Sequence, residues 1–357
     1  MDSPTGPSGQ PPAPLFIDGG TVAAALTVRE AVAAMESVLA FGFDPEMGAP
    51  RTRVETAAGT FMQMPASNGQ YVGTKLLTIT PGNATSESPV IQGLYVLFGG
   101  HDQRPLAVLD GVALTELRTS SVSAMGAMLL AGPGPKRLVV FGTGVQAWAH
   151  IVAFAELFEL ACVDIVGRNV EAAERLVKKA EAIGLAAALA GPEAVREADL
   201  IVCATASPTA LFDGAMVKAS AVVVAIGAHD REHRELDDSL LARATVCVES
   251  KESAAREAGD VIQAMESGAI AGPAQLITLA DLVLKRREVA ADRPAVFKTT
   301  GMPWEDLAVA TALFEACTAG GSDHRHGGLE MQTVPRTGPG RSIDRPGTTL
   351  RNGRTDD

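Results

Sequence analysis

Gly142 and Gly144 frame a turn whose position in the chain suits phosphate binding. They follow residues 138–141, a short unbroken apolar run of the kind that forms a strand buried on both faces. From Val145 onward the apolar residues recur at helical spacing, so the turn opens a helix. Because the first N–H groups of a helix lack internal partners and carry the positive end of its dipole, this turn favours an anion.

The first residues of that helix complete the GxGxxA spacing of dinucleotide sites. Gly142 permits the turn, Gly144 lets a pyrophosphate approach the main chain, and Ala147 keeps the helix close to the strand. Val145 and Gln146 lie between them and are further candidate cofactor contacts. The spacing alone is a weak signal, and the alternative is an ordinary glycine-rich turn. Its place between two predicted strands favours the dinucleotide site.

Arg168 stands where nucleotide sites usually distinguish NAD from NADP. The second predicted strand, residues 163–166, ends in Gly167, Arg168 and Asn169. An Asp or Glu at this point accepts from the ribose 2′-hydroxyl of NAD, whereas an Arg favours the 2′-phosphate of NADP. Arg168 and Asn169 therefore predict NADPH or NADP as cofactor. NAD is the alternative, since an arginine near this turn can also stack on adenine or remain solvated.

Three cations in the first third of the chain are candidate ligands for an anionic substrate: Arg51, Lys75 and Arg118. The net charge of the chain is −12, so an anionic substrate must be held by local cations. Lys75 lies within the apolar run GTKLLTIT, where it either points to solvent or occupies a pocket. Burial would lower its pKa toward that of an acid–base group. The run alone favours the solvated position.

Two periodicities divide the 357 residues into two regions of an α/β protein. After a helix opened by a Thr27–Glu30 capping box, strand-like runs between Arg51 and Leu109 predict an antiparallel or mixed sheet. From Leu138 to Ser250, six apolar strands alternate with helices and predict a Rossmann-type, doubly wound parallel sheet. The segment from Phe297 is expected to be a loop that leads into an amphipathic helix packed on the first region.

Ligands of a doubly wound sheet bind beyond the carboxyl ends of its strands. This rule places Thr205, Ala206 and Gly227 at the cofactor site, because they follow the fourth and fifth predicted strands. His229 leaves the fifth strand toward the same crevice. It is either a group that handles protons there or a plain surface histidine, and the sequence leaves both open.

Composition excludes several other classes of protein. The pI near 5.0 and the absence of a run of Lys or Arg argue against nucleic-acid binding. The chain begins without a basic and apolar leader, and no apolar stretch reaches membrane-spanning length, so we expect a cytoplasmic protein without a membrane partner. The four widely spaced cysteines predict neither disulfides nor a metal site. Residues 1–14 and 320–357 are expected to be disordered tails.

The sequence resembles the ornithine cyclodeaminase/mu-crystallin family from Leu15 to Thr318. The motifs that carry the resemblance are APRT at 49–52, MPAS at 64–67, GTKLLTITPGN at 73–83, LAVLDGVALTELRTSSVSA at 106–124, FGTGVQA at 141–147, AIGAHDREHRELDD at 225–238 and VFKTTGMPWEDLA at 296–308. The resemblance implies a substrate-binding and dimerisation domain of α+β type, formed by residues 15–131 with 297–319. A Rossmann domain at 132–296 lies between these segments, and the implied assembly is a homodimer.

The resemblance also implies roles for the residues identified above. The carboxylate-binding and catalytic cations of the family fall on Arg51, Lys75 and Arg118, which reverses the solvated interpretation of Lys75. Arg118 and Thr119 are implied to contact the cofactor. The dinucleotide fingerprint falls on the 142–147 turn, and the 2′-phosphate position falls on Arg168 and Asn169.

One departure from the family pattern bears on the reaction. Cyclodeaminases and related alanine dehydrogenases have an Asp where this chain has His229, and Asp230 is one residue out of register. Ketimine reductases also lack that Asp, and cyclodeaminases prefer an acidic residue where Arg168 stands. The resemblance therefore predicts an NADP(H)-dependent oxidoreductase that acts on the C–N bond of a small amino or imino acid, as an imine or ketimine reductase or an amino-acid dehydrogenase, with Lys75 and His229 handling protons.

Two alternative functions remain open. The first is an ammonia lyase of the ornithine cyclodeaminase type that recycles NAD within the site. The second is a non-catalytic protein that binds NADPH and a small ligand.

Overall fold

The computed structural model describes residues 12–86 and 88–319. The tails expected at 1–14 and 320–357 therefore lie almost wholly outside the described residues. Within residues 12–86 and 88–319, no helix is long and apolar enough to cross a membrane.

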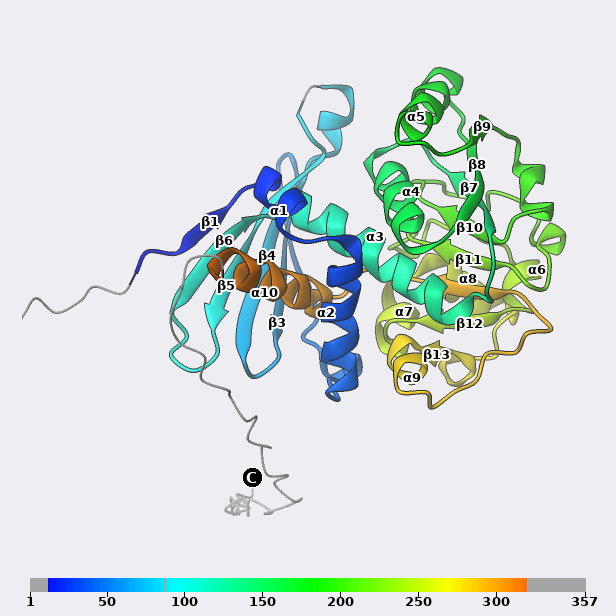
Figure 1. Ribbon diagram of the computed structural model, residues 1–357. Coiled ribbons are helices and arrows are strands. Elements are labelled where there is room, and N and C mark those ends of the chain that lie inside the picture. Colours follow the sequence, from blue (N-terminus) through cyan, green and yellow to red (C-terminus); the bar gives the residue numbers. More distant parts are fainter. Residues whose placement is uncertain (1–11, 87, 320–357) are drawn as a thin grey trace, which may run out of the picture. The chain divides into compact units, whose positions relative to one another are not determined.

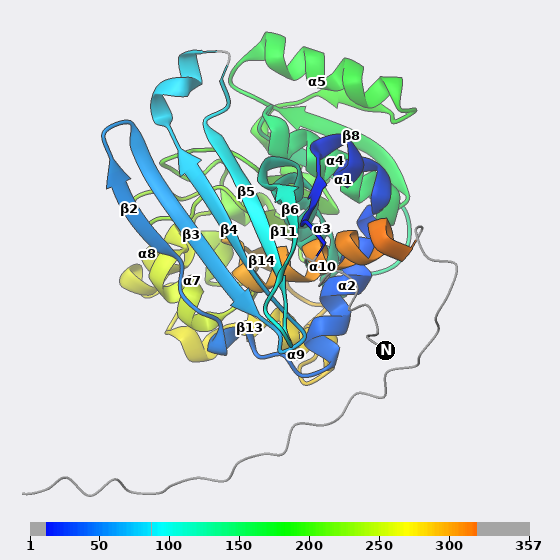
Figure 2. The ribbon, with the colours of Figure 1, turned by 90° about the vertical axis from the view of Figure 1, so that its left-hand side faces the viewer.

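The first sheet has six strands and is mixed, as expected. They are β1 (Leu15–Ile17), β2 (Thr52–Thr56), β3 (Gly59–Ser67), β4 (Tyr71–Ile79), β5 (Ile91–Gly99) and β6 (Pro105–Asp110). Their spatial order is β1-β6-β5-β4-β3-β2, and only the β1–β6 pair is parallel. Figure 2 shows β2 to β6 side by side.

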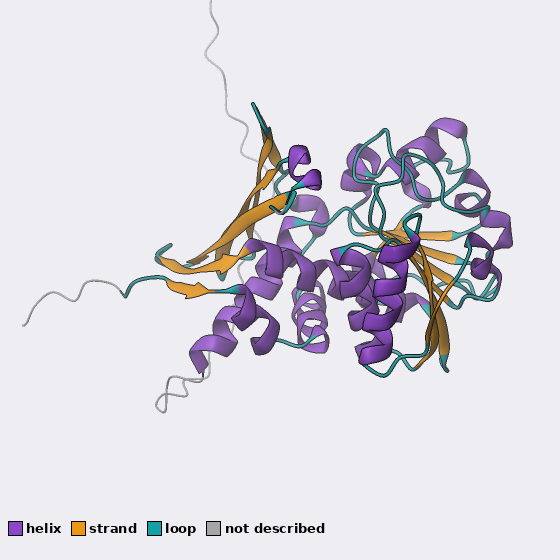
Figure 3. Cartoon of the chain, turned by 90° about the horizontal axis from the view of Figure 1, so that it is seen from above, coloured by secondary structure: helices purple, strands orange, loops and turns teal. Residues whose placement is uncertain are grey.

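Helices cover one face of this sheet, which we call its inner face (Figures 1 and 3). They are α1 (Gly19–Ala25), α2 (Val28–Ala40), α3 (Gly111–Leu130) and α10 (Pro303–Ala319). Two short 3-10 helices belong to the same region, η1 (Pro45–Met47) between α2 and β2 and η2 (Pro81–Thr85) between β4 and β5. The predicted Thr27–Glu30 capping box is present at the start of α2. Helix α3 begins at Gly111 because the Asp110 carboxylate accepts from the N–H groups of Val112 and Ala113 at 2.9 and 3.0 Å.

The second sheet has eight parallel strands and confirms the predicted doubly wound fold. They are β7 (Lys136–Phe141), β8 (Leu160–Val166), β9 (Ala187–Leu189), β10 (Leu200–Cys203), β11 (Val222–Ala225), β12 (Thr245–Val248), β13 (Ile277–Thr278) and β14 (Ala295–Lys298), in the order β13-β12-β14-β11-β10-β7-β8-β9. The connecting helices are α4 (Val145–Leu157), α5 (Val170–Ala182), η3 (Pro192–Arg196), η4 (Gly214–Met216), α6 (Asp238–Leu241), α7 (Lys251–Glu257), α8 (Gly259–Ser267), η5 (Pro273–Gln275) and α9 (Leu279–Val283).

Two of these strands were not predicted, and one of them is central. Strand β14 lies between β11 and β12, so Phe297 and Lys298 belong to a strand and the expectation of a loop from Phe297 was wrong. The run of β14 has four residues and ends in a lysine, so its sequence lacks the unbroken apolar pattern of a buried strand. Lys298 Nζ lies 3.1 Å from Asp260 Oδ2, and both side chains are fully buried.

Candidate functional site

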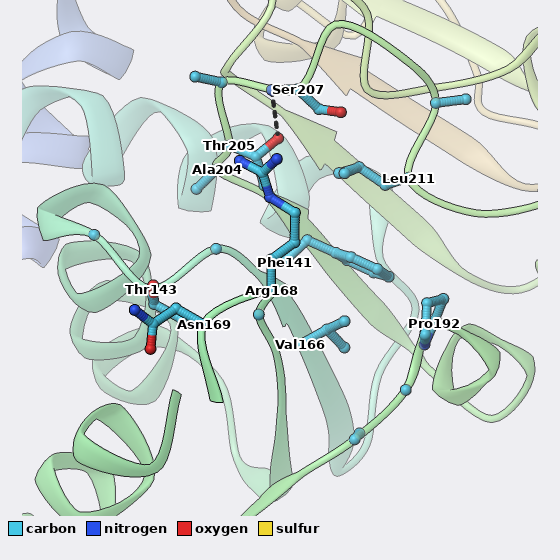
Figure 4. A pocket seen from close by; sticks show the side chains of 17 residues that line it. Phe141, Thr143, Val166, Arg168, Asn169, Pro192, Ala204, Thr205, Ser207 and Leu211 are labelled. Atoms are coloured by element: carbon cyan, nitrogen blue, oxygen red, sulfur yellow. Dashed lines mark hydrogen bonds between the residues drawn. The ribbon is translucent and has the colours of Figure 1, made fainter. Parts of the chain in front are cut away.

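A cavity of about 930 Å³ opens at the carboxyl ends of β7, β8 and β10, where the sequence placed the cofactor (Figure 4). The predicted cofactor residues that line it are Gly142, Gly144, Arg168, Asn169, Thr205 and Ala206. Val145, Gln146 and Ala147 form the first turn of α4 but are not among the lining residues. Gly227, Arg118 and Thr119 also lie outside the lining of this cavity.

The turn before α4 has the backbone geometry that a pyrophosphate requires. Gly142 has φ +118°, and a Cβ there would lie 2.4 Å from the carbonyl oxygen of Ala204. Gly144 is the N-cap of α4, no side chain caps the helix, and nothing lies within 4 Å of a Cβ built at Gly144. The free N–H groups of the first turn therefore face open space, which fits an anionic ligand.

Two orphaned polar atoms near this turn also fit a ligand. Thr119 Oγ1 and Gln146 Oε1 are buried and have no hydrogen-bond partner in the structure. They belong to α3 and α4, which pack against each other. Since buried polar atoms are rarely left unpaired, a bound dinucleotide is a reasonable partner for both.

Arg168 and Asn169 follow β8 at the rim of the cavity. The Arg168 side chain is exposed, extends along the cavity in Figure 4 and makes no ion pair with any described residue. The Asn169 side chain is partly committed, because its Oδ1 caps α5 by accepting from Ala172 N–H at 3.0 Å. Arg168 is therefore the freer of the two for a phosphate.

Glu235 joins the loops that follow β10 and β11, a role that sequence reasoning missed. Its Oε1 accepts from the N–H and hydroxyl of Thr205, each at 2.8 Å, and its Oε2 accepts from Gly227 N–H at 2.7 Å. Burial raises the pKa of Glu235, and the positive charge of Lys298 opposes this shift. Behind it, Asp260 Oδ1 accepts from the N–H of Glu235 at 2.7 Å. Glu235 lies in a polar turn of the sequence, so no local pattern marks it as buried.

Lys75 and Arg118 meet at a single carboxylate. Lys75 is 1% exposed on the inner face of β4, so the solvated interpretation drawn from its strand alone was wrong. Lys75 Nζ lies 2.9 Å and Arg118 Nε 3.0 Å from Asp306 Oδ1. Burial lowers the pKa of Lys75 to about 8, with a further contribution from the Arg118 charge and opposition from Asp306. Lys75 thus has the pKa of an acid that works near neutral pH.

Arg51 and Arg118 converge on the loop between β14 and α10. Arg51 Nη2 donates to the carbonyl oxygens of Gly301 at 2.7 Å and Thr300 at 3.2 Å, and lies 3.0 Å from Glu257 Oε2. Gly301 has φ +75°, and a Cβ there would lie 2.3 Å from Arg118 Nη1. The three predicted cations therefore lie around one site. Sequence reasoning missed their carboxylate partners: Glu249, Glu257, Glu305 and Asp306.

His229 lies on the same side of the second sheet as these cations. Its Nδ1 is 2.9 Å from the carbonyl oxygen of Gly227, so Nδ1 carries the hydrogen and Nε2 is the acceptor. Desolvation lowers the pKa of His229, the charge of Lys298 lowers it further, and Asp230 opposes both. Asp230 does not replace the missing Asp, because its Oδ1 accepts three hydrogen bonds within its own turn.

A Rossmann cleft beside a buried lysine and two arginines defines an NAD(P)-linked oxidoreductase of two-sheet α/β architecture. The chain belongs to the ornithine cyclodeaminase/mu-crystallin family, whose model matches residues 21–321. The predicted family, fold class and NAD(P)-linked oxidoreductase class are thereby confirmed.

Two relatives and one solved structure illustrate the similarity. The chain is 32% identical over 307 residues to a Δ1-pyrroline-2-carboxylate reductase of Paracoccus denitrificans, covering 84% of this chain and 96% of the relative. It is 32% identical over 247 residues to the ketimine reductase mu-crystallin of Mus musculus, covering 69% and 76%. An archaeal alanine dehydrogenase dimer with bound NAD superposes with a TM-score of 0.80 at 25% identity, covering 87% and 97%.

Proposed function

We propose that this protein reduces the C=N bond of a small imino acid, cyclic or linear, with NADPH as the preferred cofactor. The observation that carries the proposal is the buried Lys75, whose pKa is lowered to about 8 beside Arg118. The names of the Paracoccus and mouse relatives, a pyrroline-carboxylate reductase and a ketimine reductase, support the same chemistry.

Each residue of the site has a part in this proposal. Arg51 and Arg118 bind the substrate carboxylate with the N–H groups that their internal partners leave free. This fixes the position of the imine relative to the cofactor cleft. A reduced nicotinamide, when bound there, supplies the hydride that the imine carbon accepts. Lys75 donates the proton that the imine nitrogen gains, and His229 orders the pocket through its Nε2 acceptor.

The preference for NADPH rests on Arg168. Its guanidinium is exposed at the rim of the cavity and can form a charge-assisted pair with a 2′-phosphate. Calorimetric titration should show tighter binding of NADPH than of NADH, and Arg168→Ala should narrow the difference. Arg175→Ala, which removes an exposed arginine from α5, is the matched control. Equal affinities in the unaltered protein would contradict the preference.

A substrate screen tests the reaction itself. Cyclic and linear imino acids are offered with NADPH, and ammonia release is measured in parallel from ornithine and lysine. We expect oxidation of NADPH by at least one imino acid and little ammonia. If ammonia from ornithine forms as fast as the best reduction, the cyclodeaminase alternative replaces this proposal. Tight ligand binding without any turnover would favour the carrier alternative, although the retained Arg51, Lys75 and Arg118 count against it.

We also propose a homodimer formed through the first sheet. Its substrate-binding and dimerisation domain consists of residues 15–131 and 299–319, and its cofactor domain of 132–298, because Phe297 and Lys298 end β14 of the second sheet. The face of this sheet opposite the helices carries an outer apolar patch. We define this patch as Phe16, Phe61, Leu76, Leu94, Val96 and Val108. Phe16 is 64% and Leu94 44% exposed, and apolar patches of this kind mark interfaces.

A cytoplasmic location is proposed from the four free cysteines.

A further inference from the structure

A cluster of buried acids surrounds the substrate cations. We call it the carboxylate cluster, and its members are Glu249, Glu257, Glu305 and Asp306. Its partners are the buried Arg51, Lys75 and Arg118, and Glu257 also pairs with the partly exposed Arg256 at 3.0 Å. With every group ionised, the four acids and the four cations cancel. One proton on the cluster would therefore leave a net positive charge toward an anionic substrate.

Glu249 uses both of its oxygens as acceptors, which identifies it as the acceptor of the pair. Its Oε1 accepts from Gly301 N–H at 3.1 Å and from the Thr299 hydroxyl, and its Oε2 accepts from Thr300 N–H at 2.9 Å. These hydrogen bonds fix the 299–301 loop, whose carbonyl oxygens hold Arg51. Loss of the negative charge at Glu249 would weaken every one of them.

Glu305 has one oxygen engaged and one orphaned. Its Oε2 accepts from Arg118 Nη1 and from Met302 N–H, each at 3.1 Å. Its Oε1 is buried and has no donor in the structure, while the side chain lies within hydrogen-bonding reach of Glu249. A proton on Oε1 explains both observations, because it gives this atom a partner and removes the repulsion between two buried carboxylates. Burial and Glu249 raise the pKa of Glu305 well above its usual range, against the opposing charge of Arg118.

We propose that Glu305 is a positioning residue that holds a proton shared with Glu249, and that this shared proton keeps Arg118 and the 299–301 loop in place to bind the substrate carboxylate. The inference rests on the proposed function in one respect, that the substrate is a carboxylate. Glu305 acts through Arg118, and Glu249 acts through the loop that holds Arg51.

Among the described residues, three groups interact electrostatically with this pair: Arg118 from α3, Arg51 from the segment before β2 and Cys247 from β12. The titratable groups that interact in turn with these three or with Asp306 are Lys75 from β4, Tyr95 from β5, Glu257 from α7, Asp281 from α9 and Asp306 itself from α10. Glu249 also lines a second cavity of about 400 Å³ with Asp44, Lys251 and Arg286. This cavity gives the shared proton a route of exchange with solvent. At alkaline pH the pair loses the proton, and the binding of an anionic substrate weakens.

Two glutamine variants distinguish this role from a merely structural one. Glu305→Gln keeps a permanent donor toward Glu249 and an acceptor toward Arg118, so it mimics the protonated state. Glu249→Gln loses an acceptor that the 299–301 loop requires. Glu315→Gln, which changes an exposed glutamate on the same helix, is the control.

KM for the imino acid is measured against pH in the four proteins. We expect KM of the unaltered protein and of Glu315→Gln to rise about tenfold toward alkaline pH. About tenfold is the change in the protonated fraction per pH unit above the pKa of a titrating group. Glu305→Gln should hold KM constant within about twofold over that range, and Glu249→Gln should start with a raised KM at neutral pH. Infrared difference spectra should show a protonated carboxyl band that disappears in Glu305→Gln and persists in Glu315→Gln.

Three results would overturn the inference. They are an alkaline rise in KM that survives in Glu305→Gln, equal defects in the two glutamine variants, and no carboxyl band lost in Glu305→Gln. If no imino acid is turned over, the proposed function fails separately. The infrared band and the affinity for a saturated amino acid at neutral and alkaline pH then test whether Glu305 and Glu249 share a proton.

Discussion

One carboxylate oxygen serves two cations, and this sharing sets the chemistry of Lys75. Asp306 Oδ1 accepts from both Lys75 and Arg118, yet Arg118 stays charged at any working pH. Arg118 therefore takes much of the stabilisation that Asp306 offers and also repels the ammonium of Lys75. Burial lowers the pKa of Lys75 most, and the Arg118 charge lowers it further, to about 8.

Loss of the Lys75 proton should slow imine reduction. In the proposed reaction the charged lysine is the acid, so kcat and kcat/KM should fall as pH rises through about 8. Lys75→Ala should lower kcat/KM by ~10²-fold or more and abolish the pH dependence of kcat, as measured by steady-state kinetics. Lys178→Ala, at an exposed position on α5, should change neither kcat/KM nor the pH dependence of kcat. A kcat that stays flat across this range would exclude Lys75 as the acid.

His229 should be less important for reduction than Lys75. Its pKa is lowered, and its Nδ1 donates to Gly227, which leaves Nε2 as an acceptor, so His229 is not the proposed source of the proton. His229→Ala should lower kcat/KM by ~10-fold. His229→Asp restores the carboxylate of the deaminating relatives, and should release measurable ammonia from a diamino acid while losing reductase rate. His101→Ala, at an exposed loop position, is the control, and a loss in His229→Ala as large as in Lys75→Ala would contradict this ranking.

The sequence predicts the cations of the site but not the acids that hold them. Arg51 follows a proline, Lys75 lies within an apolar run and Arg118 lies early in a predicted helix. Glu249 and Asp306 are remote from these cations in sequence. Asp306 is buried where α10 packs on β4, and Glu249 where it holds the 299–301 loop. Local spacing carries no signal for such pairing, so burial of the whole cluster had to come from the structure.

Helix α3 is the element that connects the two sheets. It packs on β5 of the first sheet, on β11 and β14 of the second, and on α4. Gly126 allows the close approach to β14, since a Cβ there would lie 2.4 Å from the Phe297 ring. His150 of α4 joins the two helices, with Nε2 at 2.8 Å from Ser123 Oγ and Nδ1 at 2.7 Å from Gln146 O. This contact holds the start of α4 beside Arg118 and Thr119.

The buried His150 should make the fold sensitive to acid. Burial lowers its pKa to about 4, whereas the unfolded chain has the ordinary value of 6.5. The unfolded state binds more protons between these values, so the stability present above pH 6.5 is lost as pH falls toward 4. The loss amounts to about 3 kcal/mol of unfolding free energy at most. Urea unfolding at pH 7 and 4.5 should show a smaller difference in His150→Gln than in the unaltered protein.

His101→Ala is the control for this measurement, because His101 is exposed and no shared helix contact depends on it. An identical pH dependence in His150→Gln and the unaltered protein would show that other groups cause the acid loss.

The elements themselves were largely predictable, and the failures have a common cause. The Thr27–Glu30 capping box, the 170–182 helix and the run before Gly142 each carry a complete local signal. Strand β13 has two residues, too few for a period to show, and β14 ends in a lysine that masks its burial. Their place in the sheet is fixed by neighbours such as Asp260, which neutralises Lys298.

At the scale of the whole molecule, the two sheets supply different halves of the site. The first sheet and α3 carry Lys75 and Arg118, and the second carries the cofactor turn and His229. Glu249, at the end of β12, fixes the loop that leads to α10 and so links the two halves. In a protein of net charge −12, three cations, each paired with a buried carboxylate, thereby meet at the proposed substrate site.

The outer apolar patch of the first sheet should hold two chains together. Sedimentation analysis should give twice the 36.9 kDa mass of one chain. Leu94→Lys places a charge in the centre of the patch, where Leu94 pairs with Leu76 across β4 and β5. Because a buried unpaired ammonium is strongly unfavourable, the dimer dissociation constant should rise ~10²-fold or more. Ile183→Lys changes an exposed apolar residue after α5 and should leave the dimer dissociation constant unchanged. A monomer in the unaltered protein, or an intact dimer in Leu94→Lys, would show that this face is not the interface.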